Sequence, residues 1–193
     1  MEKADKIAII VGGVMLATIT TLAIIYRRTL NYQAKKLMGA NYITVDMLCA
    51  STTAKQKGIN NTPNATVKAN LEALITNVLN PIVEKVGFIP SINSGYRCEA
   101  LNKVVGGTSS SQHLTGQAAD IGGSRDQVCK IFEAAVALGN YDQLIFEKKN
   151  SYWVHISYKK DGTNRHEILA TKTGGSPYTD ITTNPLINYL KFV

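Results

Sequence analysis

The stretch S-S-S-Q-H-L-T-G-Q-A-A-D, residues Ser109 to Asp120, decides the predicted organisation of this 193-residue chain. It places a histidine, His113, and a carboxylate, Asp120, seven positions apart across Gly116, in a run of small and hydroxyl side chains. Such a run has no amphipathic helical period, so the pattern favours a loop that leads into a strand. Because Gly116 lets the backbone reverse, we expect His113 and Asp120 to converge.

A second histidine, His155, lies in the segment W-V-H-I-S, residues 153–157, whose β-branched and aromatic residues are typical of a strand. Two imidazoles and one carboxylate are enough to bind Zn²⁺ and leave a fourth position for water, as in catalytic zinc sites. Spacing alone is weak evidence, because a capping or buried hydrogen-bonding role is more common for a His or an Asp. The site is therefore a hypothesis at this point.

Several motifs occur in a fixed order: S-G-Y-R at 94–97, L-N at 101–102, V-G-G at 105–107, S-Q-H-x-x-G-x-A-A-D-I at 111–121 and W-V-H at 153–155. Together they resemble the zinc peptidases of the M15 family, which are D-alanyl-D-alanine carboxypeptidases and related bacterial and phage peptidoglycan endopeptidases. The run 60–81 is similar to that family's first helix, so the resemblance covers residues 42–160. It implies a Zn²⁺ cofactor held by His113, Asp120 and His155, and the M15 or hedgehog-type DD-peptidase fold.

Metal-assisted amide hydrolysis needs a metal that polarises the scissile carbonyl and lowers the pKa of water. A cation beside the metal assists, and Arg97 is the candidate for binding the oxyanion or a terminal carboxylate of the substrate. The alternative for Arg97 is a structural role at the end of a strand. Ser111 either contacts substrate or has a cap or turn role in the loop.

A general base is the part in which the sequence departs from the family. Many members have an acid three residues before the last histidine ligand, or a histidine two before it, where this chain has Tyr152 and Trp153. The nearest carboxylate is Glu147, and a five-residue loop register would place it on the same sheet face as His155. A four-residue loop would turn it away. We predict Glu147 as the base, the alternative being an exposed glutamate at a turn, and Trp153 as either a cleft wall or a core residue.

Residues Ile7 to Tyr26 form a run of twenty residues without a charge. At about 1.5 Å per residue, such a helix crosses a hydrocarbon layer of about 30 Å. No persuasive cleavage site precedes Arg27, so we predict a retained single-span anchor. Residues 1–40 are then a membrane anchor with a basic juxtamembrane segment, and residues 41–193 are the peptidase domain.

The basic residues that follow the span favour a cytoplasmic domain, whereas a cell-wall hydrolase requires the opposite orientation. Either the bias is overridden, or the span is held and later released, as in some phage lysis enzymes. We expect a bacterial or phage-encoded, single-pass protein whose domain faces the cell wall.

The formal net charge is +7, and six basic residues between Arg27 and Lys57 are opposed only by Asp46. This segment would attract anionic lipid, and acidic envelope polymers are a second candidate partner. No nucleic-acid module accompanies it, so nucleic acid is not an expected partner. The three cysteines form no C-x-x-C pair and receive no role, and nothing in the sequence indicates an oligomeric state.

The predicted fold is α+β, an antiparallel sheet with packed helices preceded by the transmembrane helix. A helix begins at Thr62-Pro63, is kinked at Asn80-Pro81 and ends at Gly87. A second long helix follows a capping box at Ser124 and ends at Leu138. The expected strands are 88–93, 143–147, 152–158 and 165–171, with a short helix at 98–104 and a docked or mobile tail from residue 174.

These features predict zinc-dependent hydrolysis of peptide bonds in peptidoglycan stem peptides or cross-links. A serine hydrolase built on Ser111, His113 and Asp120 is disfavoured, because no G-x-S-x-G motif surrounds Ser111. The second alternative is a membrane-tethered, catalytically inactive zinc domain that binds peptidoglycan. The missing acid beside His155 favours that alternative.

Overall fold

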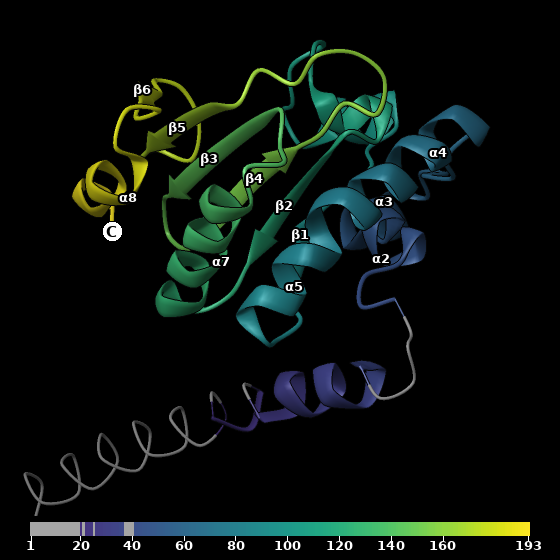
Figure 1. Cartoon of the computed structure of the whole chain (residues 1–193). Coiled ribbons are helices and arrows are strands. Elements are labelled where there is room, and N and C mark those ends of the chain that lie inside the picture. The colour runs from purple at the N-terminus through teal and green to yellow at the C-terminus, as the bar shows by residue number, and fades with distance from the viewer. Residues whose placement is uncertain (1–19, 21, 25, 37–40) are drawn as a thin grey trace, which may run out of the picture.

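The computed structural model describes residues 20, 22–24, 26–36 and 41–193 (Figure 1). Most of the predicted membrane span, residues 7–26, lies outside the described residues. Among the residues that are described, no helix is both long and apolar enough to cross a membrane. The anchor and the domain boundary near residue 40 stay predictions.

In the described part of the chain, six strands form one sheet in the order β1-β2-β4-β3-β5-β6. Helices accompany this sheet, which confirms the α+β class. The strands are β1 (Ser91–Ser94), β2 (Ala118–Gly122), β3 (Gln143–Lys148), β4 (Tyr152–Ser157), β5 (Glu167–Thr171) and β6 (Thr179–Asp180).

The prediction of a purely antiparallel sheet is wrong at one pair, since β3 and β5 are parallel. Ser157, at the end of β4, and Glu167, at the start of β5, both lie opposite Gln143 at the start of β3. Residues 158–166 therefore pass around the start of β3 and bring β5 to its other edge. A strand placed there runs antiparallel to β4 and so parallel to β3.

This crossing loop is anchored on Asp142, a buried residue immediately before β3. The Asp142 carboxylate accepts hydrogen bonds from the Arg165 main chain at 3.0 Å, from Arg165 Nη2 at 2.6 Å and from Gln112 Nε2 at 3.0 Å. Lys159 Nζ lies 3.0 Å from it. Burial raises the pKa of Asp142, but these donors outweigh burial and hold the pKa well below its usual range.

Helix α7 packs against β2, β3 and β4, and α5 packs beside α7 on the same side of the sheet (Figure 1). Alternate residues of the central strands point into this core and are fully buried: Ala119, Ile121, Leu144, Phe146, Val154 and Ile156. The described helices are α2 (Val45–Cys49), α3 (Thr52–Lys57), α4 (Ala65–Leu74), a π-helical turn (Ile75–Leu79), α5 (Asn80–Val86), α6 (Glu99–Val104), a 3-10 turn (Gln112–Thr115), α7 (Arg125–Leu138), α8 (Pro185–Asn188) and a second 3-10 turn (Tyr189–Lys191), besides helical residues in 20–36.

The ends of the helices follow local chemistry. Helix α4 starts later than predicted, because the Asn64 side chain accepts the Val67 N–H at 2.9 Å and so replaces Thr62 as the N-cap. Helix α7 has the predicted capping box of Ser124 and Gln127 and ends at Leu138. These caps satisfy main-chain groups that the helix itself leaves unpaired.

Pro81 disturbs the long helix as predicted, and a π-helical turn, Ile75–Leu79, comes just before it. Because proline has no N–H, the carbonyl of Asn77, four residues earlier, loses its usual donor. The side-chain amide of Asn140 donates to that carbonyl at 2.8 Å. A residue beyond α7 thus completes the hydrogen bonding of this helix.

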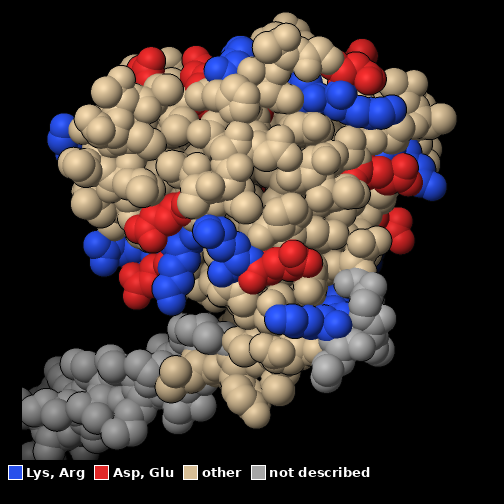
Figure 2. Space-filling model, viewed as in Figure 1, with Lys and Arg blue, Asp and Glu red and all other residues tan. Residues whose placement is uncertain are grey.

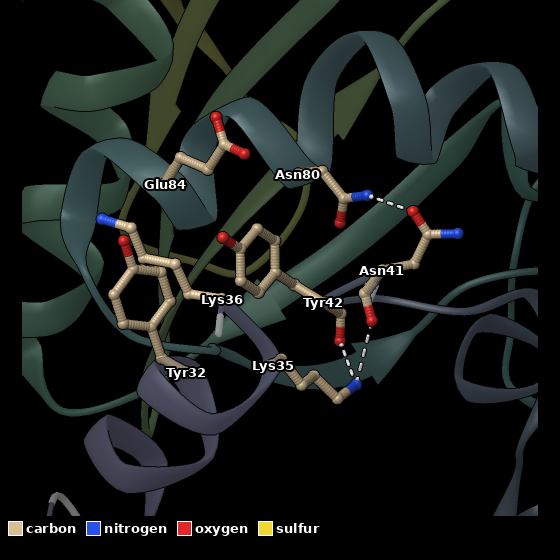
Figure 3. Close-up of a pocket in the computed structure, with 7 residues that line it drawn as sticks. All are labelled: Tyr32, Lys35, Lys36, Asn41, Tyr42, Asn80 and Glu84. Carbon is tan, nitrogen blue, oxygen red and sulfur yellow. Dashed lines mark hydrogen bonds between the residues drawn. The ribbon is translucent and has the colours of Figure 1, made fainter. Parts of the chain in front are cut away.

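Residues 26–36 are helical and contact the domain (Figure 3). Tyr32 is buried and stacks on Tyr42 with ring centroids 5.3 Å apart. Lys35 Nζ donates to the carbonyl oxygens of Asn41 and Tyr42 at 3.1 and 2.8 Å. This part of the predicted juxtamembrane segment therefore packs against the domain.

The carboxyl-terminal tail is docked. Tyr189 is 2% exposed, and its hydroxyl donates to Glu133 of α7.

On the face shown in Figure 2, basic and acidic side chains lie beside one another around a largely uncharged centre. That face therefore carries no large patch of one sign.

We predict that Asp142→Asn lowers the stability of the domain. The change removes the charge that pairs with Arg165 and Lys159. Breaking a buried pair typically costs roughly 3–5 kcal/mol, and we expect about 2 kcal/mol here because both cations are partly exposed and can be rehydrated. Urea unfolding of the variant measures the loss.

Asp126→Asn is the matched control, since Asp126 is exposed and its contact with Arg125 spans 4.0 Å. Because folding lowers the pKa of Asp142, wild type loses this stabilisation when the carboxylate is protonated. The loss begins as the pH falls below about 4, the ordinary pKa of an unfolded aspartate, and continues down to the lower pKa of Asp142 in the folded state. Equal unfolding midpoints for wild type and Asp142→Asn at neutral pH would contradict the prediction.

Candidate metal centre

The pairing of β2 with β4 brings two of the three predicted ligands together. Asp120 lies directly opposite His155 in this antiparallel pair, so both side chains share one face of the sheet. His155 Nδ1 is 2.9 Å from Asp120 Oδ1. The face is the one opposite to the buried core residues.

His113 arrives from the 3-10 turn that precedes β2. This turn ends at Gly116, which has φ +70°, and a Cβ there would lie 2.8 Å from the Val67 carbonyl oxygen of α4. His113 Nε2 lies 3.3 Å from Asp120 Oδ1. One ligand atom from each of His113, Asp120 and His155 lies within 4.8 Å of the others, so the predicted convergence is present.

The hydrogen bonding of His113 suits a metal ligand. Its Nδ1–H donates to the Gly95 carbonyl oxygen at 2.7 Å, so in the neutral ring Nε2 is unprotonated and faces Asp120. Burial lowers the pKa of His113, although the charge of Asp120 opposes this. His113 Nε2 and Asp120 Oδ1 are then both acceptors that face one another, so a cation between them stabilises the pair. Two imidazole nitrogens and one carboxylate oxygen are ligands that suit Zn²⁺.

Asp120 is held in its ionised form. Burial raises its pKa, but the charges and hydrogen bonds of His113 and His155 outweigh burial and keep the pKa far below its usual range. A carboxylate must be deprotonated to bind a metal. The three residues therefore fit a zinc ion.

The loop after β1 fixes the neighbourhood of His113. Gly95 has no room for a side chain, because a Cβ there would lie 2.2 Å from the Leu48 carbonyl oxygen. The Arg97 N–H donates to the His113 carbonyl at 3.1 Å. The Asn61 side chain ties this loop to α2 with hydrogen bonds to Cys49 O, Tyr96 O and Cys98 N.

The Arg97 guanidinium lies beside the ligand cluster. Its Nη2 is 3.8 Å from Asp120 Oδ2. Its Nε is buried and has no hydrogen-bond partner among the described residues. Arg97 lines the cleft and its side chain is partly exposed, so the accessible part of the guanidinium can bind an anionic group of a substrate.

Glu147 lies on the same sheet face as His155, as the five-residue register predicted. It is directly opposite Trp153 in the β3–β4 pair. Only 6% of Glu147 is exposed, so it is not a solvent-exposed glutamate at a turn. Burial, aided by the charge of Asp120, raises its pKa to about 7, while His155, Trp153 and Arg97 act in the opposite direction.

These side chains open into one cleft of about 770 Å³. Ser111 and Trp153 both line it, so Trp153 is a wall residue rather than a core residue. Both ring nitrogens of His113 face other groups, Gly95 O and Asp120 Oδ1, so this histidine is not available as a base for Ser111. This geometry disfavours the serine-hydrolase alternative.

Sequence reasoning missed three parts of this site. Gly95 was considered only as part of the S-G-Y-R motif at 94–97, because no local sequence pattern indicates that a glycine lies against another segment. The hydrogen bond from Gln112 to Asp142 joins the turn of His113 to β3, across thirty positions. Tyr178, which also lines the cleft, lies in a tail whose Thr, Gly and Pro content indicates only a loop.

The comparison with protein families agrees with this geometry. The model of the family described as Peptidase M15 matches residues 41–157, which is more than half of the chain. The chain belongs to the peptidase M15 family. M15 peptidases are zinc-dependent metallopeptidases, and this M15 chain has a His-Asp-His cluster that can hold a metal. A comparison with curated proteins gave no match.

We predict that the zinc-loaded chain holds one zinc and that His113→Ala loses most of it, because the change removes one of three protein ligands. Elemental analysis after removal of free metal measures this. His166→Ala is the control, since His166 is not part of the cluster and its ring contacts Tyr141 instead. Unchanged zinc content in His113→Ala would rule out the ligand assignment.

Proposed function

We propose that this M15 peptidase hydrolyses peptide bonds in peptidoglycan stem peptides or cross-links, with zinc bound by His113, Asp120 and His155. The observation that carries the catalytic part is the position of Glu147. It is a buried carboxyl group in the ligand cleft, and its pKa of about 7 matches that of a general base at neutral pH. Glu147 thus has the function of the acid that many family members carry three residues before the last histidine ligand.

Bound zinc would supply Lewis acidity, which polarises the scissile carbonyl and makes water easier to deprotonate. Glu147 accepts the proton of the attacking water and passes it to the leaving amine, so the carboxyl group is regenerated as a carboxylate. Arg97 donates to the oxygen that gains negative charge when the carbonyl is attacked. Trp153 and Ser111 contact the peptide from the cleft walls.

The choice of substrate is supported by the ordered motifs, which resemble those of D-alanyl-D-alanine carboxypeptidases and peptidoglycan endopeptidases. The Arg97 guanidinium, which lines the cleft, suits a terminal carboxylate as well as an oxyanion. We propose a bacterial or phage-encoded protein that is anchored through residues 7–26 with its domain facing the cell wall. The uncharged run of membrane length supports the anchor. The orientation follows from the proposed cell-wall substrate and requires that the bias of the basic residues after the run, which favours a cytoplasmic domain, is overridden.

Glu147→Gln tests the catalytic proposal. We expect the variant to keep its zinc, because no ligand is removed, and to hydrolyse amides about a hundredfold or more slowly, the usual scale of general acid–base assistance. The assay follows release of D-alanine or cross-link fragments from purified muropeptides, with and without a chelator. Glu72→Gln, at an exposed glutamate of α4 that contacts Lys68, is the matched control.

The outcomes separate the alternatives. Zinc loss in Glu147→Gln would mean that Glu147 supports the metal, and full activity would mean that another group is the base. A wild-type chain that binds zinc and muropeptides but releases no product would disprove the peptidase proposal and favour the binding module.

Membrane attachment has its own test. The full-length chain should sediment with membranes, whereas a chain starting at Arg27, which keeps the contact between Tyr32 and Tyr42, should stay in the supernatant. Amino-terminal sequencing of the natural protein is the complementary measurement. A mature protein that begins near Arg27 would mean that the apolar run is a removed signal.

A further inference from the structure

One wall of the cleft comes from outside the region that matches the family. Residues 172–178, here called the strap, connect β5 to β6, whereas the family match ends at residue 157. Four strap residues line the cleft that also contains Glu147 and Trp153: Gly174, Gly175, Ser176 and Tyr178. The catalytic face is therefore completed by a segment that the family pattern does not describe.

The strap is anchored at both ends. The hydroxyls of Thr171 and Thr173 donate to the Gly175 carbonyl oxygen at 2.8 and 2.7 Å. After the strap, Thr179 of β6 pairs with Ala170 of β5, and the Ile181 N–H donates to the Ile168 carbonyl at 2.9 Å. Tyr178, directly before β6, is thus held in position by main-chain pairing.

The strap is also seated on Trp153. Gly174 has φ +66°, and a Cβ at this position would lie 2.8 Å from the Trp153 ring and 3.1 Å from Lys149 Cβ. A residue with a side chain would push the strap away from the indole. Gly174 therefore brings the backbone of the strap close to the tryptophan that shares a sheet face with His155.

Within the strap, Tyr178 presents an unused hydrogen-bond donor. Its side chain lines the cleft and the residue is 43% exposed, and its hydroxyl has no hydrogen-bond partner in the described part of the chain. Burial, with the charges of Glu147 and Asp120, raises the pKa of this phenol, so it remains a donor at neutral pH. A phenol in this position can donate to a carbonyl oxygen of a bound peptide.

We propose that Tyr178 is a substrate-binding residue whose phenol donates a hydrogen bond to a main-chain carbonyl oxygen of the peptide, and that the strap determines how the peptide is held beside Trp153. Tyr178 is far more exposed than Glu147, so it contacts the substrate at the rim and not at the bond that is cleaved. Its effect falls on affinity. The inference rests on the proposed function for the identity of the peptide.

The test uses the full-length, zinc-loaded chain and a stem pentapeptide that ends in D-Ala-D-Ala. Tyr178→Phe keeps the ring and removes only the hydroxyl, so we expect KM to rise about threefold to tenfold, the scale of one hydrogen bond between uncharged groups. We expect kcat to stay within about twofold, because the contact is equally strong before and during the reaction. Zinc content should not change.

Tyr152→Phe is the matched control. Tyr152 adjoins Trp153 in β4 but lies on the helix side of the sheet, near Phe146, and it does not line the cleft. It should have the KM of wild type. A Tyr178→Phe variant with the KM of wild type would overturn the inference, and so would a fall in kcat alone.

A binding measurement separates this inference from the proposed function. Calorimetry with the same pentapeptide in the Glu147→Gln background, with and without Tyr178→Phe, reports affinity without turnover, and the same threefold to tenfold weakening is expected. If wild type binds the peptide through Tyr178 but releases product neither from it nor from cross-linked muropeptides, the hydrolysis proposal fails and the inference holds. If wild type cleaves the peptide and Tyr178→Phe changes neither KM nor affinity, the inference alone fails. If the pentapeptide does not bind and neither it nor cross-linked muropeptides are cleaved, both are wrong.

Discussion

Asp120 Oδ1 lies between nitrogens of two imidazoles, and the rest of the site depends on this three-way contact. One imidazole comes from a turn and the other from a strand, so the contact exists only while β2 and β4 keep their register. A slip of one residue in β4 would turn His155 towards the helices and expose Val154 and Ile156. Burial of those two apolar side chains therefore maintains the strand register that the ligand geometry requires. Core packing and metal binding thus depend on the same pairing of β2 with β4.

Features with local causes were predicted well from the sequence. The Ser124 capping box, the end of α5 at Gly87 and the shared face of Glu147 and His155 all follow from short-range rules of spacing and side-chain direction. The convergence of His113 with Asp120 was predicted from the turn at Gly116, whereas His155, thirty-five positions from Asp120, was placed in the ligand set through the resemblance to the M15 family. Membership of the M15 family supports that ligand set, and the local patterns support the other predictions by themselves.

Other features that depend on contacts between distant segments were not predicted. The parallel pairing of β5 with β3 is stabilised by Asp142, whose partners lie up to thirty positions away. An aspartate before a strand looks the same in sequence whether it is buried or exposed. The N-cap of α4 was misplaced for a different reason, since Thr62 and Asn64 are both good capping residues and only the path of the preceding loop chooses between them.

The partner that orients His113 is a main-chain carbonyl, that of Gly95. Side-chain mutation at any position leaves that oxygen in the chain, so this support is lost only when the backbone itself moves. A scan that replaces polar side chains one at a time would therefore not detect it. The mutations that would disturb this support are therefore at residues that have no polar side chain. The main one is Gly95, because a Cβ there would meet the Leu48 backbone.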